Sequence, residues 1–232
     1  MGLIDLVVLE TSGTLVCDDD AVVTALIEAL GVFDGVGYPG VHEDRLSFVA
    51  NTRGLSILSV LRSMLGDERQ AEYAHHAFEL ALPSVLAQGG VRPVAGAEDA
   101  LVALRAAGHR VCLLSRLSPR CLDAIVDLLG WRDLVDLTVA PDAGLRTPPH
   151  PDLVLTAMLR LGVTGVRDVA VVAENANVLV AGARAGASAV IGVLTGAQAL
   201  AELQRVPHTH TVETLADVPR LLEVVGRRVR AA

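Results

Sequence analysis

Short apolar runs that alternate with amphipathic segments constrain the fold of this chain more than any other feature. The runs are rich in Val, Leu and Ile, and they occupy residues 3–9, 110–115, 134–140, 168–173 and 188–193. Between them, residues 96–109, 118–130 and 150–162 have apolar positions at helical spacing and a glycine near the end. Strands and helices in alternation indicate right-handed βαβ units, and strands that are apolar throughout indicate a sheet covered on both faces. The sequence therefore predicts an α/β fold with a Rossmann-like parallel sheet.

A helical segment interrupts this pattern after the first strand. Its helix-like stretches have no strand-like run between them, and they occupy residues 18–30, 55–65 and 71–87. Residues 88–96 are rich in Gly and Pro, which is typical of a linker returning to the core. We predict a helical cap domain at 17–90, inserted into a core domain formed by 1–16 and 91–232. Because ligands of open α/β sheets bind beyond the carboxyl ends of the strands, the cap would cover the binding site.

The composition limits the partners and the location of the protein. A net charge of −8 argues against nucleic acid and anionic membrane as partners, and the apolar runs are too short to span a bilayer. No signal-peptide pattern opens the sequence, and the three cysteines have spacings that suit neither disulfides nor zinc. We expect a cytoplasmic protein that acts on a small-molecule substrate, with a homodimer as a further option.

The absence of lysine restricts the chemistry. All 19 basic residues are arginine. The chain can therefore form no lysine Schiff base with a carbonyl substrate, and it can place no ammonium group beside a phosphate.

Several motifs occur in an order that is found in one known superfamily. "VVLETSGTLV" (7–16) is followed by the helical insertion, by a strand that ends in Ser115, by a Pro-rich helix start and by a strand that ends in Glu174. This order resembles the haloacid dehalogenase superfamily over almost the whole chain. With "ARAGASAVIGVLTGA" (183–197), it is most similar to the phosphonoacetaldehyde hydrolase and phosphonatase-like branch. The resemblance implies a hydrolase in which an Asp nucleophile attacks a phosphoryl group with the help of Mg²⁺.

The catalytic positions that the resemblance identifies are altered in this chain. Glu10 stands where the family has its Asp nucleophile, and Ser12 where phosphatases of the family have an Asp that acts as general acid and base. Pro148 replaces the Lys or Arg that neutralises the phosphate, and Arg146 would have to reach in from two residues earlier. Ser115 keeps the hydroxyl with which the family holds substrate oxygens. The lysine that phosphonoacetaldehyde hydrolase uses for its Schiff base has no counterpart, so that activity is excluded.

The positions that resemble the magnesium ligands are weakened. "VVAENANVLVAG" (171–182) places Glu174 and Val178 where the family has two Asp residues, and Asn175 offers a neutral oxygen. Mg²⁺ demands near-ideal octahedral geometry, and each Asp to Glu change lengthens the side chain by about 1.5 Å. We expect no cofactor; Glu10, Glu174 and Asn175 are the candidate ligands if Mg²⁺ does bind.

Glu10 and Glu174 are the main candidates for catalysis because a carboxylate is kept at both positions. Two carboxylates at neighbouring strand ends push their pKa values apart, which leaves one protonated near neutral pH and one charged. Such a pair serves as general acid and general base. Ser12 is the third predicted catalytic residue, and the predicted substrate-binding residues are Thr11, Ser115, Arg116, Arg53 and Arg146.

Three functions remain open from the sequence. The first is a metal-independent acid/base enzyme, or a binder, that takes a small organic substrate under the cap. The second is a residual Mg²⁺-dependent phosphatase or hydrolase of a small phosphorylated metabolite. The third is a non-catalytic pseudoenzyme with a protein partner.

Other polar residues receive a structural interpretation. His75 and His76 are adjacent in a predicted helix and point to different faces, so we expect no metal site there. Cys112 lies in an apolar run and is expected to be buried, and His208 and His210 are expected on an edge strand.

Overall fold

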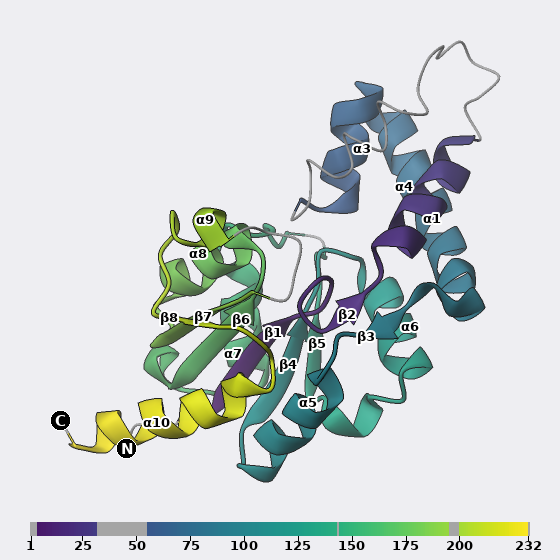
Figure 1. The fold of residues 1–232 in the computed structure, drawn as a ribbon. Coiled ribbons are helices and arrows are strands. Elements are labelled where there is room, and N and C mark those ends of the chain that lie inside the picture. Colours follow the sequence, from purple (N-terminus) through teal and green to yellow (C-terminus); the bar gives the residue numbers. More distant parts are fainter. Residues whose placement is uncertain (1–3, 32–54, 143, 195–199, 232) are drawn as a thin grey trace.

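The core of the protein is a six-stranded sheet with the strand order β5-β4-β1-β6-β7-β8, in which all neighbouring strands are parallel. The computed structural model describes residues 4–31, 55–142, 144–194 and 200–231 (Figure 1). The strands of this sheet are β1 Leu6–Glu10, β4 Arg110–Leu114, β5 Leu137–Val139, β6 Val169–Ala173, β7 Ala189–Val193 and β8 His210–Val212. The predicted α/β fold with a Rossmann-like parallel sheet is confirmed. Of His208 and His210, both expected on an edge strand, the structure places only His210 within the strand, in β8.

Helices cover both faces of the sheet, which explains why the central strands are apolar throughout. Leu6 and Val8 of β1 belong to a buried cluster with α7 (Asp152–Arg160), α8 (Ala176–Ala185) and α9 (Leu200–Leu203). Val7 and Leu9 point to the other face, where the cluster includes α5 (Ala97–Ala106), α6 (Pro119–Leu128) and α10 (Asp217–Ala231). Cys112 is buried, as predicted. Two short 3₁₀ turns, η2 (Arg132–Leu134) and η3 (Val166–Asp168), precede β5 and β6.

The insertion after β1 is helical in the described residues. It contains α1 (Asp19–Gly31), α3 (Ile57–Leu65), α4 (Glu68–Val85) and the short helix η1 (Leu86–Gly90). Ser56 and Asp67 cap the N-termini of α3 and α4, since their side chains accept backbone N–H groups of Ser59 and Gln70. Gly66, with φ of +68°, ends α3. Local capping therefore sets the boundaries of these helices.

The chain leaves the core and returns to it through a pair of short strands. β2 (Val16–Cys17) pairs with β3 (Arg92–Pro93) in antiparallel orientation, and Figure 1 shows this pair between the sheet and the inserted helices. The inserted helices lie beyond the carboxyl end of β1 (Figure 1). The insertion therefore stands over the edge of the sheet where ligands bind in folds of this kind. In the part of the chain that the structure describes, no helix combines the length and the apolar character needed to cross a membrane.

Candidate active site

The polar residues predicted for the site come together at one edge of the sheet. Glu10 ends β1, Ser115 follows β4 and Glu174 follows β6, and β1 lies between β4 and β6 in the sheet. Because these strands are parallel, their carboxyl ends meet at the same edge. All three residues are buried, with exposed fractions of 8%, 1% and 7%.

One hydroxyl group links the two glutamates. Thr14 Oγ1 donates to Glu10 Oε2 at 3.1 Å, and it accepts the backbone N–H of Glu174 at 2.9 Å. The backbone N–H of Asn175 also donates to Glu10 Oε2, at 3.1 Å. The hydrogen bonds from Thr14 and from Asn175 therefore reach the same oxygen of Glu10. The sequence analysis missed Thr14, although a buried polar residue in the turn "ETSGT" was a signal for it.

Gly13 lets the carboxylate of Glu174 approach this turn. Its φ of +81° lies in the left-handed region, and a Cβ atom built on it would lie 1.8 Å from Glu174 Oε1. Only a residue without a side chain leaves that space to the carboxylate. The turn after β1 therefore brings Glu174 against the loop that carries Glu10.

Burial and nearby charges determine the pKa of the Glu10 carboxyl group. Burial raises the pKa of Glu10 to about 8, and the negative charge of Glu174 contributes to the rise. Hydrogen bonds from Asn175 and Thr14 and the guanidinium of Arg116 oppose it. At neutral pH, Glu10 therefore carries a proton.

Replacing Thr14 by Val tests the link between the two glutamates. We expect the free energy of unfolding to fall by about 1–3 kcal/mol, because the buried N–H of Glu174 loses its acceptor. The pKa of Glu10 should rise further, because the hydroxyl no longer stabilises the charged form. Denaturant unfolding measures the first change, and the pH dependence of Glu10 carboxyl bands in infrared difference spectra against Glu10→Gln measures the second.

Thr138→Val is the matched control for this substitution. Thr138 lies half-buried on the edge strand β5, which β4 separates from β1, and its hydroxyl donates to Asp123 of α6. We expect it to cost less than about 1 kcal/mol and to leave the pKa of Glu10 unchanged. Equal stability losses and no pKa change in Thr14→Val would contradict a special role for Thr14.

The structure pairs Ser12 with a carboxylate that the sequence analysis did not select. Ser12 Oγ donates to Asp18 Oδ2 at 2.6 Å, and both residues are buried. The backbone C=O of Asp18 accepts the N–H of Val22 in α1. The Ser12 hydroxyl thus bonds to the start of the inserted helices, and its predicted catalytic role stays a prediction.

Thr11 and Ser115 use their hydroxyl groups differently. Thr11 is fully buried, and its Oγ1 donates to the backbone C=O of Leu114 at 3.1 Å, so its side chain fastens the loop to β4. The predicted substrate-binding role of Thr11 stays a prediction. Ser115 Oγ accepts the backbone N–H of Leu117 at 3.0 Å, which leaves its O–H available as a donor.

A cleft of about 670 Å³ opens between the inserted helices and the core. The core contributes Arg116, Ser118, Pro119, Pro141, Asp142, Gly144, Leu145, Arg146, Thr147 and His150, and the insertion contributes Ser56, Leu58, Ser59, Arg62, His75 and Glu79. Neither Glu10 nor Glu174 lines this cleft, but Arg116 does and follows Ser115 directly. His75 is one of the residues that line the cleft, a position that the sequence does not indicate. Arg53 lies outside the described residues.

The donor groups of the site do not fit the octahedral magnesium site that the family resemblance implies. Glu10 Oε2 already accepts two hydrogen bonds, and Asn175 Oδ1 accepts a backbone N–H as the cap of α8. Val178, which is buried, stands where the family has a further acid. Within the described ranges, no group of three or more His, Cys, Asp or Glu residues is arranged to hold a metal ion. The residues present therefore do not fit a Mg²⁺ ion in octahedral coordination.

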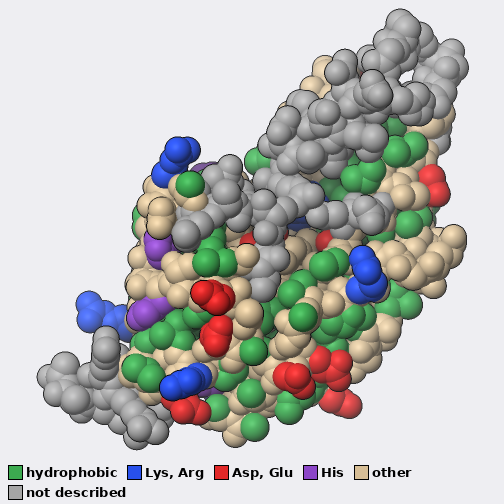
Figure 2. Space-filling view, in the orientation of Figure 1, with side chains coloured by type: hydrophobic (Ala, Val, Ile, Leu, Met, Phe, Trp, Pro, Cys, Tyr) green, Lys and Arg blue, Asp and Glu red, His purple; other side chains and the backbone are tan. Residues whose placement is uncertain are grey.

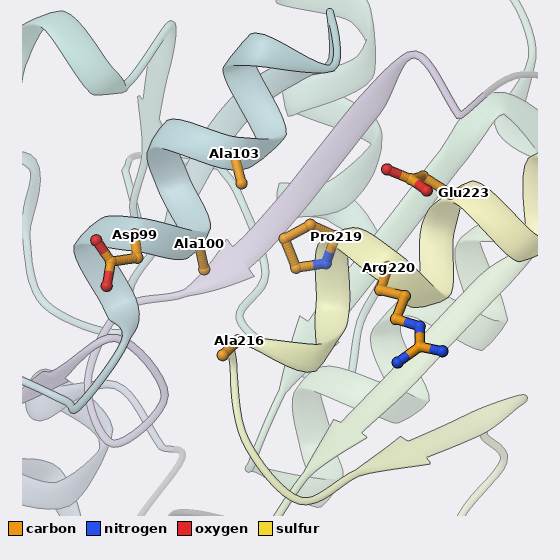
Figure 3. Close-up of a pocket in the computed structure, with 7 residues that line it drawn as sticks. All are labelled: Asp99, Ala100, Ala103, Ala216, Pro219, Arg220 and Glu223. Atoms are coloured by element: carbon orange, nitrogen blue, oxygen red, sulfur yellow. The ribbon is translucent and has the colours of Figure 1, made fainter.

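A second hollow lies away from the two glutamates. It has a volume of about 490 Å³ between α5 and α10, with Ala100, Ala103, Ala216 and Pro219 as its apolar lining. Figure 3 shows that the charged side chains around it, Asp99, Arg220 and Glu223, stand apart from one another. Because its polar groups do not converge on one point, it is not a candidate active site.

On the face that Figure 2 draws, neither acidic nor basic side chains dominate the described surface. Figure 2 shows acidic, basic and hydrophobic side chains interspersed over the described residues of that face. The expectation that nucleic acids and membranes are not partners stays a prediction.

The chain is similar to known hydrolases in sequence. Residues 4–186 match the family described as haloacid dehalogenase-like hydrolase. "Probable phosphatase IndB" of Dickeya dadantii (strain 3937) is 27% identical over 217 residues, which cover 92% of this chain and 91% of that protein.

Solved structures share the fold. The phosphonoacetaldehyde hydrolase-like protein from Oleispira antarctica has a TM-score of 0.80 at 19% identity, covering 100% of this chain and 95% of that one. CbbY from Rhodobacter sphaeroides, solved in complex with phosphate, has a TM-score of 0.76 at 17% identity, covering 93% of this chain and 96% of that one. At these identities the likeness establishes the fold alone.

Proposed function

The chain belongs to the haloacid dehalogenase-like hydrolase family, and on this basis we propose that it is a hydrolase in which Glu10 and Glu174 act as a proton-transfer pair on a small anionic substrate. The observation that carries this proposal is the pairing itself. The buried carboxyl groups of Glu10 and Glu174 both lie against the turn that follows β1, and burial raises the pKa of Glu10 to about 8. A carboxylic acid that keeps its proton at neutral pH beside a charged carboxylate has the properties of a general acid and base pair.

The reaction uses each carboxyl group once. Protonated Glu10 donates its proton to the oxygen of the leaving group, while charged Glu174 accepts a proton from the attacking water molecule. The hydroxide equivalent bonds to the substrate as the bond to the leaving group breaks. A proton then passes from Glu174 to Glu10, which restores the starting state. Thr14 and Asn175 both donate hydrogen bonds to Glu10 Oε2. Among the described residues, no donor is hydrogen-bonded to the other carboxyl oxygen, Oε1.

A Mg²⁺-dependent phosphatase is the second candidate function. Similarity favours it, because the curated relative is named a probable phosphatase and CbbY was solved with phosphate. It requires Glu10 to ionise and to act as the nucleophile at the position of the family's Asp. The two hydrogen bonds that Glu10 Oε2 already accepts favour proton transfer instead.

Metal removal and restoration of the Asp separate the two candidates. We expect turnover of small phosphate and carboxylate esters to be unchanged by EDTA or by added Mg²⁺. Glu10→Asp should lower turnover at least about tenfold, because retracting the carboxyl group by about 1.5 Å spoils its alignment. Steady-state rates of wild type and variant, with and without EDTA, measure both effects.

The opposite pattern would support the phosphatase. Stimulation by Mg²⁺ together with a higher rate for Glu10→Asp would overturn the proton-transfer proposal. A complete lack of turnover with every ester would favour the non-catalytic alternative, in which the protein works through a partner. We propose a cytoplasmic location and a small-molecule substrate as parts of the same hypothesis.

A further inference from the structure

Among the residues that the structure describes, three arginines line the cleft between the inserted helices and the core, and two of them form ion pairs. Arg62 on α3 binds Glu68, with Nε 2.9 Å from Oε2. Arg146 binds Asp152 through two hydrogen bonds, Nε to Oδ1 at 2.9 Å and Nη2 to Oδ2 at 3.0 Å. In both pairs the carboxylate offsets the charge of the guanidinium and occupies some of its five N–H donors, so each is less suited to a substrate anion than an arginine without such a partner. Arg146 lines the cleft, and its predicted substrate-binding role stays a prediction.

Arg116 differs from these two arginines. It is half-buried and lines the cleft, and no carboxylate of the described residues forms an ion pair with it. Its charge acts on Glu10 at the base of the site. It follows Ser115, whose hydroxyl group is free to donate a hydrogen bond. A cation, a hydroxyl group and the carboxyl group of Glu10 thus occupy one region.

We propose that Arg116 binds the phosphate or carboxylate group of the substrate and supplies the cation that the chain lacks at Pro148. The inference rests on the proposed function, because it places this anion beside Glu10. A planar guanidinium at the edge of a cleft binds either oxyanion through two parallel hydrogen bonds. The Ser115 hydroxyl adds a third donor. In this chain the charge comes from the loop after β4, whereas Pro148 lies in the loop after β5.

Binding of simple anions tests this role without turnover. Isothermal titration calorimetry with inorganic phosphate and with malonate would compare wild type, Arg116→Ala, Arg116→Lys and Arg120→Ala. We expect Arg116→Ala to weaken binding of at least one anion about ten- to a hundredfold, which is typical for charged hydrogen bonds. Arg116→Lys should recover part of the loss, because it keeps the positive charge but lacks the planar pair of N–H donors of the guanidinium. Arg120, exposed on α6 and outside the cleft, is the matched control and should bind like wild type.

The outcomes separate this inference from the proposed function. If wild type binds neither anion, or if Arg116→Ala binds both as wild type does, the inference fails whatever the turnover shows. If phosphate alone is affected, the substrate carries a phosphate, and if malonate alone is affected, it carries a carboxylate; either result supports the inference. Glu10→Gln should keep anion binding while losing turnover, so a failure of the proton-transfer proposal would appear in the rates and not in the titrations. Thermal unfolding of each variant verifies that it is folded.

Discussion

Replacing Glu10 by Gln is expected to lower turnover about 10²- to 10⁴-fold, the range typical for loss of a general acid. The amide is close to the carboxyl group in shape, and its oxygen can accept the hydrogen bonds from Thr14 and Asn175. It cannot deliver a proton to a leaving group. The loss should therefore appear in kcat, with anion binding retained.

The same substitution is expected to stabilise the protein at alkaline pH. Because the pKa of Glu10 rises from 4.5 to about 8 on folding, the native state keeps a proton that the unfolded chain has released between these pH values. The native state then binds more protons, so the free energy of unfolding falls as pH rises through this window. At about 1.4 kcal/mol per pKa unit, Glu10 should account for a loss of about 3–5 kcal/mol between pH 4 and pH 9.

Denaturant unfolding at a series of pH values measures this effect as a difference between wild type and Glu10→Gln. Groups other than Glu10 contribute to both proteins and largely cancel. Glu98→Gln, at an exposed position in the first turn of α5, is the control and should follow wild type at every pH. Parallel curves for wild type and Glu10→Gln would show that Glu10 is not protonated in the native protein at neutral pH.

Replacing Gly13 by Ala is expected to lower turnover strongly, although both glutamates are kept in the sequence. The new Cβ would occupy the position of Glu174 Oε1, which must move away. Displacement of a reacting group by about 1 Å can cost on the order of a hundredfold in rate, and we expect a loss of that size in kcat. The left-handed backbone of Gly13 should add about 1–2 kcal/mol of destabilisation.

Gly108→Ala separates backbone strain from displacement of the carboxylate. Gly108 has a φ of +86°, close to that of Gly13, but a Cβ there would meet no atom within 4 Å. It should lose a similar free energy of unfolding and keep the wild-type rate. If both variants were equally active, the proximity of Gly13 and Glu174 would have no bearing on catalysis.

Much of the fold and part of the site follow from sequence patterns. The apolar runs that end at Glu10, Ser115 and Glu174 specify parallel strands, and parallel strands must present their carboxyl ends at one edge. The side chains after those strands were therefore predictable as neighbours. Helix boundaries in the insertion were predictable for a similar reason, since Ser56 and Gly66 act within one or two turns of their own position.

The partners of individual side chains were harder to predict. The sequence did not indicate that Asp152, six residues on, accepts two hydrogen bonds from the Arg146 side chain. It also did not indicate that the packing of α4 places His75 at the cleft. Each outcome depends on the distance between segments that the sequence alone leaves undefined.

By itself, the sequence determined the layered α/β architecture, the helical insertion and the presence of two glutamates at adjacent strand ends, because periodicity and strand direction act locally or by simple topology. Only the tertiary structure decided that Thr14 bridges those glutamates, that Glu174 lies against Gly13 and that Glu10 retains its proton. The reason is physical. Proton affinity depends on burial and on charges within a few ångströms, and those distances are set when segments more than a hundred residues apart are packed together.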